Sequence, residues 1–215
     1  MEKDLKQQFD GISSCDVVDA LWALNATRSF FPRVVCHSPA FLCASVNLVA
    51  RAHTVKMVVP NTTLTAPAHH FVDCAEEGSI VVVECPEDTV HACWGELMTL
   101  RAMSLRVAGV VTNGNIRDLS ELQQLQFPAF CRGVSCQGTK GGLQVAEIGG
   151  VVSIAGVPVS AGDVIVADCN GVAVVPLSEV EAVLKNCREM QEKDARVKTA
   201  LVSGMTVKEA FATYR

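Results

Sequence analysis

The sequence predicts a mixed α/β fold, and three observations lead to this prediction. Short Val- and Ile-rich segments alternate with segments of helical periodicity over the first 130 residues. Between residues 133 and 176 the helical periodicity disappears, and short apolar runs alternate with Gly, Pro and Asn. A long Glu- and Lys-rich segment of helical character follows. We therefore expect one compact α/β domain over residues 1–215, with a strand-rich second half and a C-terminal helix.

Individual elements follow from the same patterns. Helices are predicted where apolar residues recur at helical spacing: residues 2–24, 64–77, 94–107, 118–125, 178–198 and a last short helix from about residue 206. Strands are predicted where apolar runs end at turn residues: residues 44–59, 79–84, 107–112, 128–130 and a hairpin over 162–176 with Asn170-Gly171 at its turn. Ser13-Ser14 and Ser178 are candidate caps that open helices, and Gly78 is a candidate closing residue.

The segment 94–125 organises the rest of the chain. Its first helix carries an apolar stripe opposite a polar face, formed by Leu97, Leu100, Met103 and Val107. A buried strand, a turn at residues 113–115 and a second helix follow, and Asp118 with Glu121 fits a capping box. Polar residues thus follow directly after the carboxyl end of a strand, which is where open α/β sheets tend to bind ligands.

Composition limits the classes of function. Hydrophobic residues make up 49% and charged residues 19% of the chain, as expected for a well-buried globular protein, and low charge with many Val and Ala suggests burial between subunits. A net charge of −5 disfavours direct nucleic-acid binding. With no 18-residue apolar run and a polar start, we expect neither a membrane span nor a secretory signal, and a cytoplasmic location. The ten cysteines form no C-x-x-C pair and are interpreted as reduced core residues.

Glu96, Arg117 and Asp118 form the constellation of chemical interest. Glu96 lies in the first turn of its helix, and the intervening helix and strand lead out and back to Arg117-Asp118. Two carboxylates can hold a hard cation such as Mg²⁺ directly or through water. A guanidinium offers a forked donor for a carboxylate or enolate oxygen, and the N–H groups of Leu97 and Met98 at the helix start, after Gly95, can help to hold an anion.

Structural interpretations stand beside these. Asp118 can be a simple N-cap for the second helix, and Glu96 is favoured at a helix start by the macrodipole. Arg117 can pair with Asp118 alone. Further polar residues are interpreted as turn, strand-end, core or surface residues rather than ligands: Asp163, Asp168, His53, His69, His70 and His91.

Motifs along nearly the whole chain resemble one known family. They are Ser13-Ser-Cys-Asp-Val-Val-Asp-Ala-Leu21, Ala52-His-Thr-Val-Lys56, Trp94-Gly-Glu-Leu97, Gly109-Val-Val-Thr-Asn-Gly-Asn-Ile-Arg-Asp118, Pro128-Ala-Phe-Cys-Arg-Gly133 and Gly162-Asp-Val-Ile-Val-Ala-Asp168. The chain resembles the regulator of ribonuclease activity A family, which also contains class II 4-hydroxy-4-methyl-2-oxoglutarate and 4-carboxy-4-hydroxy-2-oxoadipate aldolases. The resemblance implies a β/β/α swivelling-type fold and a homotrimer, sometimes stacked to a hexamer.

The resemblance also implies roles. Asp118 would ligate Mg²⁺ or Mn²⁺ directly, and Glu96, where the aldolase pattern commonly has Asp, would be an outer ligand. Arg117 would bind the pyruvyl group together with the N–H groups near Gly95. Glu192 from the C-terminal helix of a neighbouring subunit would complete the metal site, with Glu189 and Asp194 as alternatives.

The expected function is a metal-dependent aldolase or oxaloacetate decarboxylase that acts on 2-oxo acids through a pyruvate enolate. No motif marks a Schiff-base lysine. The alternative is a non-catalytic ring that regulates a ribonuclease or RNA helicase by protein–protein contact, for which the acidic charge suits a basic partner. A phosphohistidine carrier is disfavoured because the Gly-rich loop at residues 139–142 contains no histidine.

Overall fold

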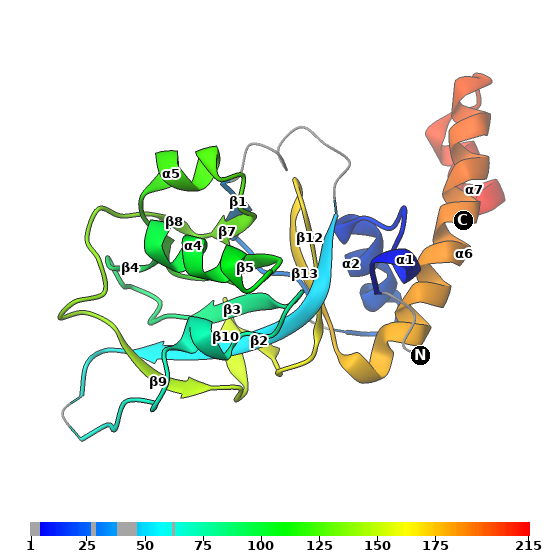
Figure 1. Cartoon of the computed structure of the whole chain (residues 1–215). Coiled ribbons are helices and arrows are strands. Elements are labelled where there is room, and N and C mark those ends of the chain that lie inside the picture. Colours follow the sequence, from blue (N-terminus) through cyan, green and yellow to red (C-terminus); the bar gives the residue numbers. More distant parts are fainter. Residues whose placement is uncertain (1–4, 27–28, 38–46, 62) are drawn as a thin grey trace.

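A mixed sheet forms the centre of the computed structural model, which describes residues 5–26, 29–37, 47–61 and 63–215 (Figure 1). The strand order is β1-β7-β5-β3-β2-β12-β13, and β9 also pairs with β2. These strands are β1 (Val35–Cys36), β2 (Leu48–Val58), β3 (Ile80–Glu84), β5 (Gly109–Thr112), β7 (Ala129–Cys131), β9 (Gln144–Ile148), β12 (Val164–Asp168) and β13 (Gly171–Val175). The inner strands β2, β3, β5 and β7 run parallel, and the others join antiparallel.

Both faces of the parallel strands are buried, which explains their continuous apolar sequences. Alternate residues of β3 enter different cores: Ile80 and Val82 lie in one cluster, and Val81 and Val83 in the other. The first cluster is covered by the hairpin of β10 (Val152–Ile154) and β11 (Val157–Val159). The second is covered by α4 (Glu96–Ser104), α5 (Leu119–Gln124) and the 3₁₀ helix η1 (Phe71–Cys74).

A second, smaller sheet extends the carboxyl ends of the parallel strands. It consists of β4 (Ala92–Trp94), β6 (Asn115–Ile116) and β8 (Gly133–Val134), all parallel, in the order β4-β6-β8. The turn from β5 to β6 needs Gly114, because a Cβ there would lie 2.7 Å from Cys85 Sγ. The buried Asn113 side chain bonds to both the N–H and the C=O of Cys85. This small sheet carries the chain from the main sheet to the candidate site.

The N- and C-terminal helices pack together on the β12–β13 side. They are α1 (Leu5–Gln8), α2 (Ser14–Ala23), α6 (Val180–Val202), which follows the 3₁₀ turn η2 (Leu177–Glu179), and α7 (Val207–Tyr214). Ser13 and Asp16 form a capping box at the start of α2. The buried Asp168 carboxylate accepts hydrogen bonds from Ser14 N and Ser14 Oγ, both at 2.8 Å, and so ties α2 to the hairpin. The distal half of α6 projects from the body, accompanied by α7 (Figure 1).

Several predictions of local structure are wrong. Residues 64–77 form an irregular segment that contains the short η1 instead of a long helix; Pro67 has no N–H to donate and disfavours a helix that runs through it. The turn of the β12–β13 hairpin is Cys169-Asn170, one position earlier than predicted, because Asp168 pairs with Gly171. Ser178 does not cap α6, which begins at Val180 and has no side-chain cap.

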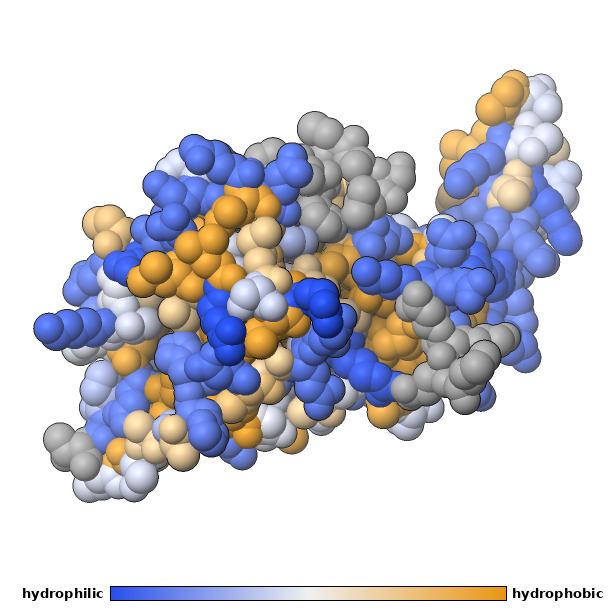
Figure 2. Space-filling view, in the orientation of Figure 1, coloured by the Kyte–Doolittle hydropathy of each residue, from blue (hydrophilic) through white to orange (hydrophobic). Residues whose placement is uncertain are grey.

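The apolar stripe of α4 is also in a different place than expected. Leu97, Leu100 and Met103 are 67%, 45% and 42% exposed, whereas Thr99 and Ala102 face the core. Small residues are buried there because the helix lies close to the sheet, and the apolar stripe faces outward. Figure 2 shows apolar surface in the region where α4 lies in Figure 1. A helical periodicity in the sequence locates an apolar face but does not show what covers it.

The α/β class, the strand-rich second half and the C-terminal helices are confirmed. No helix in the described ranges is both long and apolar enough to cross a bilayer. The nine described cysteines are free; Cys43 lies outside the described residues, as does the start of the strand predicted from residue 44. Five are buried as expected, but Cys15, Cys74, Cys136 and Cys169 are exposed.

Candidate functional site

Arg117 and Asp118 follow directly after β6, at its carboxyl end. The Arg117 N–H donates to Trp94 O at 2.9 Å, which fixes this corner against the end of β4. Asp118 then adopts a left-handed backbone conformation, with φ 57° and ψ 46°. A non-glycine residue pays roughly 1–2 kcal/mol for that conformation. Asp118 is one of several described non-glycine residues with a positive φ, and it is the one that lies in the sequence motif.

The Asp118 carboxylate caps α4, not α5. Asp118 occupies the N-cap position of α5, but its side chain makes no capping hydrogen bond there, so the predicted capping box with Glu121 is wrong. Instead Asp118 Oδ2 accepts the Glu96 N–H at 3.0 Å. The carboxylate therefore lies at the positive end of the α4 macrodipole, next to the first-turn N–H groups of Leu97 and Met98, which have no intrahelical acceptor.

Two glycines make room for this arrangement. A Cβ on Gly95 would lie 2.5 Å from Asp118 Oδ2 and 3.0 Å from Arg117 Cγ. A Cβ on Gly138 would lie 2.7 Å from Arg117 Nη1. The loop that contains Gly138 is held by His91, whose Nδ1 contacts Gly138 O at 2.7 Å. The Arg117 side chain thus passes between the start of α4 and a fixed loop.

Arg117 keeps donors for a ligand. Its ion pair with Asp118 joins Nε to Oδ2 at 3.5 Å, and the side chains are 44% and 35% exposed. Among the described residues Arg117 has no other ion pair, so its two terminal nitrogens can bind an anion. The Asp118 contacts in this part of the chain all involve Oδ2, which leaves Oδ1 for a cation or a donor.

These residues line a cavity of about 210 Å³. Its wall is formed by Met57, His70, Phe71, Ala92, Cys93, Trp94, Gly95, Leu97, Met98, Arg117, Asp118, Thr139, Leu143 and Val145. The cavity is below the roughly 300–1,000 Å³ of drug-sized ligand pockets, so its size fits a small metabolite. The structure therefore brings together Gly95, Leu97, Met98, Arg117 and Asp118 as predicted from the sequence.

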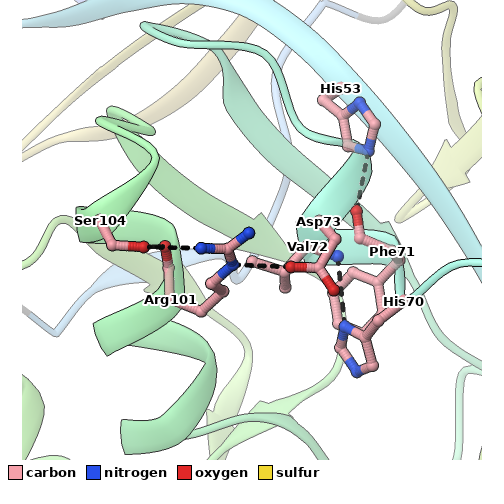
Figure 3. A network of polar contacts seen from close by, with 7 residues as sticks. All are labelled: His53, His70, Phe71, Val72, Asp73, Arg101 and Ser104. Carbon is pink, nitrogen blue, oxygen red and sulfur yellow. Dashed lines mark hydrogen bonds and ion pairs between the residues drawn. The ribbon is translucent and has the colours of Figure 1, made fainter.

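One wall of the cavity is held in place by a polar network between η1 and α4 (Figure 3). Arg101 of α4 forms an ion pair with Asp73 at 2.6 Å and also donates to Ser104 Oγ. Phe71 O contacts His53 Nε2 at 3.2 Å; burial lowers the pKa of His53, and this hydrogen bond opposes that effect. His70 Nδ1 accepts the Val72 N–H at 3.4 Å. These contacts position Phe71 and His70 against the cavity.

Buried thiols lie at and near the cavity wall: Cys93 lines the cavity, and Cys85 and Cys131 do not. Thr112 Oγ1 lies 3.4 Å from Cys93 Sγ and 3.8 Å from Cys85 Sγ. A hydrogen bond with Cys93, together with burial, raises the pKa of Cys85, and the same hydrogen bond lowers the pKa of Cys93. Burial raises the pKa of Cys131 to about 12. Cys85 and Cys131 therefore stay protonated at neutral pH, as expected for core residues.

Other predicted site residues lie elsewhere. The Glu96 backbone bonds to Asp118, but the Glu96 side chain does not line the cavity. Glu192 is exposed on α6, at the opposite end of the molecule from α4 (Figure 1). Asp163 bonds to backbone N–H groups of Ser160 and Leu177, in agreement with its structural interpretation.

The residues present fit a hard divalent cation that is held mainly by non-protein ligands. Within the described ranges no three His, Cys, Asp or Glu side chains gather as a metal site. Asp118 nevertheless offers a carboxylate oxygen next to the cavity, and Mg²⁺ is commonly held by one or two carboxylates together with water and substrate. Asp118 would hold such an ion directly. Glu96 contacts Asp118 through its backbone N–H, and its side chain does not line the cavity, so the Glu96 carboxylate would act only through water.

Fold and site together define an α/β protein with a small cavity, lined by one arginine and one aspartate, at the carboxyl ends of its strands. The chain belongs to the RraA-like family, because the family model described as Aldolase/RraA matches residues 14–174. It is similar to the "Putative 4-hydroxy-4-methyl-2-oxoglutarate aldolase" of Halalkalibacterium halodurans, with 29% identity over 98% of this chain and 94% of the relative. It is also similar to Protein DlpA of Legionella pneumophila, with 27% identity over 98% of this chain. The chain spans about a third (34%) of the length of DlpA.

Solved structures share the fold. An uncharacterized protein from Pseudomonas syringae superposes with a TM-score of 0.86 at 24% identity, covering 98% of this chain and 93% of that one. RraAS2 of Streptomyces coelicolor, described as an unusual member of the RNase ES inhibitor RraA protein family, gives a TM-score of 0.78 at 23% identity, covering 91% of this chain and 98% of that one. The fold class implied by the resemblance is therefore confirmed.

Sequence reasoning missed most of the cavity wall. Met57, Phe71, Leu143 and Val145 read as ordinary core residues, and His70 as a surface residue. They lie on β2, η1 and β9 or directly before them, and these elements are far apart in sequence. The pairing of Met57 with Val145 between β2 and β9 brings two of them together, and no local pattern reports that pairing. For the loop beside Arg117, the sequence signal was the group of glycines around residue 140, which indicates a loop but not what it contacts.

Proposed function

We propose that the chain is a divalent-metal-dependent lyase that cleaves or decarboxylates 2-oxo acids through a pyruvate enolate. The observation that carries this proposal is the position of Asp118 and Arg117 at the start of α4, on one cavity. The similarity to the relative named as an aldolase supports the same class of reaction. Mg²⁺ or Mn²⁺, when bound, would act as a Lewis acid on the keto oxygen.

The residues of the chain have separable roles in this proposal. Asp118 holds the cation, and its own position is fixed by the Glu96 N–H. Arg117 binds the substrate carboxylate or the developing enolate oxygen with its terminal nitrogens. The N–H groups of Leu97 and Met98 point from the first turn of α4 and favour negative charge at the same place. The buried Trp94 and Phe71 exclude water from one side.

We further propose that the working unit is a homotrimer or hexamer. Glu192 cannot reach the cavity of its own chain, since α6 and α4 lie at opposite ends of the molecule (Figure 1). If Glu192, Glu189 or Asp194 contributes to the site, it does so from a second copy. Light scattering coupled to size-exclusion chromatography gives the mass of the assembly. A monomer that is fully active would exclude any contribution of these residues in trans.

The test is release of pyruvate from 4-hydroxy-4-methyl-2-oxoglutarate and from oxaloacetate, followed with lactate dehydrogenase and NADH. We expect turnover that depends on Mg²⁺ or Mn²⁺, stops with chelator and falls at least 10²-fold in Asp118→Ala. Asp163→Ala is the matched control, because Asp163 accepts hydrogen bonds from backbone N–H groups of Ser160 and Leu177 and does not line the cavity. Absence of turnover with both substrates, at any metal concentration, would exclude the proposal.

A second candidate function is a regulator that binds a ribonuclease or RNA helicase. The exposed apolar stripe Leu97-Leu100-Met103 favours it, because such a surface on α4 suits a protein contact. Leu100→Glu would abolish capture of an RNA-degradation protein by the purified chain, if this function is correct. Retention of capture in Leu100→Glu, or lack of capture by the parent, would argue against it.

A further inference from the structure

The cavity that holds Arg117 and Asp118 is almost free of other charge. Of the fourteen described residues that line it, only these two carry a full charge; polar groups come from His70, Thr139, the Cys93 thiol and the Trp94 indole. The remaining wall is apolar or glycine. Met57, Phe71 and Leu143 in this wall are 3%, 4% and 8% exposed, so their side chains are packed and leave little freedom to admit water.

The lysines that adjoin wall residues in the sequence, Lys56 and Lys140, do not line the cavity. Lys56 precedes Met57 on β2, and successive side chains of a strand point to opposite faces. The Lys56 ammonium accordingly forms an ion pair with Glu84 at 3.6 Å, away from the cavity. Lys140 follows Thr139 but is exposed and does not line the cavity. Within the described residues, Arg117 is therefore the single full cation on the cavity wall.

We propose, on the basis of the proposed function, that the preferred substrates are 4-hydroxy-2-oxo acids with one carboxylate and a short apolar group at C4. Arg117 is engaged by the pyruvyl carboxylate or enolate. A second carboxylate at C5 would then find no second cation in a wall formed largely by residues such as Met57, Leu143 and Val145, and burying a charge without an ionic partner is unfavourable. A methyl or ethyl group would gain from the same contacts. The volume of about 210 Å³ limits that group to a short one.

Cleavage of such a substrate balances without a further reactant. The C4 hydroxyl loses its proton, the C3–C4 bond breaks, and its electron pair forms the pyruvate enolate. The C4 carbon leaves as a short aliphatic aldehyde. A proton added at C3 gives pyruvate, so the overall reaction neither consumes nor releases protons.

Binding of non-cleavable analogues tests the proposal independently of turnover. 2-Oxopentanoate and 2-oxoglutarate have five carbons each and differ in the terminal methyl or carboxylate. Trp94 lies in the cavity wall, and Trp22, the other tryptophan, is 73% exposed on α2, so Trp22→Phe isolates the Trp94 fluorescence. We expect a Kd at least tenfold lower for 2-oxopentanoate, which equals about 1.4 kcal/mol.

A charge placed in the wall provides the matched test. Val145→Arg puts a second cation on the cavity wall, and we expect it to tighten the binding of 2-oxoglutarate at least fivefold and to weaken the binding of 2-oxopentanoate. Val151→Arg is the control, because Val151 is 61% exposed and does not line the cavity. It should leave both Kd values within twofold of the parent. Thermal unfolding of each variant verifies that the fold is retained.

Turnover separates failure of this proposal from failure of the proposed function. We expect 4-hydroxy-2-oxopentanoate to be cleaved with kcat/KM at least tenfold above that of 4-hydroxy-4-methyl-2-oxoglutarate. Equal or better binding and cleavage of the dicarboxylates, with oxaloacetate still decarboxylated, would overturn the substrate class and leave the enolate chemistry intact. Binding of pyruvate but of neither five-carbon analogue would overturn it too. Inactivity with every substrate, oxaloacetate included, would remove the proposed function itself.

Discussion

Gly95→Ala tests whether the corner at the start of α4 is built for Asp118. The new Cβ would lie 2.5 Å from Asp118 Oδ2, whereas an unstrained contact needs about 3.4 Å. The carboxylate must therefore move by roughly 0.9 Å, the difference between these distances, and the 3.0 Å hydrogen bond from Glu96 N is lost or distorted. A misplacement of about 1 Å at a reacting centre can cost around 10²-fold in rate.

The fold should tolerate the same change. The φ of Gly95 is −164°, an extended conformation that alanine adopts without strain. Loss of one hydrogen bond to a half-exposed carboxylate costs about 1 kcal/mol of unfolding free energy. Gly95→Ala should therefore lower kcat/KM for oxaloacetate about 10²-fold and weaken Mn²⁺ binding in calorimetry, while urea unfolding shows a loss of only about 1 kcal/mol.

Gly133→Ala is the matched control on the neighbouring strand β8. Its Cβ would lie 2.8 Å from Asn115 Oδ1, a similarly close contact, but outside the cavity. This variant should lose comparable stability and keep its activity and Mn²⁺ affinity. If Gly95→Ala retained activity within threefold of the parent, the reasoning that places Asp118 at the reacting centre would be refuted.

Two further predictions concern stability. Burial lowers the pKa of His53 and of His37 in the folded state, so protonation of these residues favours unfolding. The free energy of unfolding should therefore be highest above pH 6.5 and fall as the pH drops below that value. In urea titrations from pH 8 to 5, His53→Gln should reduce this pH dependence. A slope unchanged in His53→Gln would contradict that cause. Asp168→Ala should cost about 2–4 kcal/mol, because Ser14 N, Ser14 Oγ and Asn170 N lose a buried charged acceptor. Pyruvate release should persist at temperatures where the variant is folded, and a selective loss of activity would show that Asp168 acts in the site.

The overall order of elements and the place of Arg117-Asp118 after the end of a strand could be predicted because they depend on local patterns. Buried strands, helix periodicity and turn residues all act within short windows of sequence. The capping role of Asp118 could not be predicted in the same way. An aspartate before a helix predicts a cap for that helix, and only the tertiary fold shows that its carboxylate turns to the N–H of Glu96 instead.

The orientation of α4 is a second example. The spacing of Leu97, Leu100 and Met103 correctly indicates an apolar face, but the helix presents Thr99 and Ala102 to the sheet. Thr99 is buried because its hydroxyl accepts the Trp94 Nε1–H at 2.8 Å and donates to Gly95 O. A polar residue with both partners satisfied can be core, and the sequence alone does not show that Trp94 and Gly95, just before α4, supply these partners.

The length of α6 has a consequence for how the molecule opens. Its 23 residues extend over roughly 35 Å at 1.5 Å per residue. Val183 and Cys187, near its start, belong to the core shared with α2, whereas Val197 and Ala200 pack with Ala210 of α7 in a separate small cluster. The distal half can therefore melt while the sheet stays intact, so its amides should exchange with deuterium by subglobal fluctuations, far sooner than those of β3 and β5.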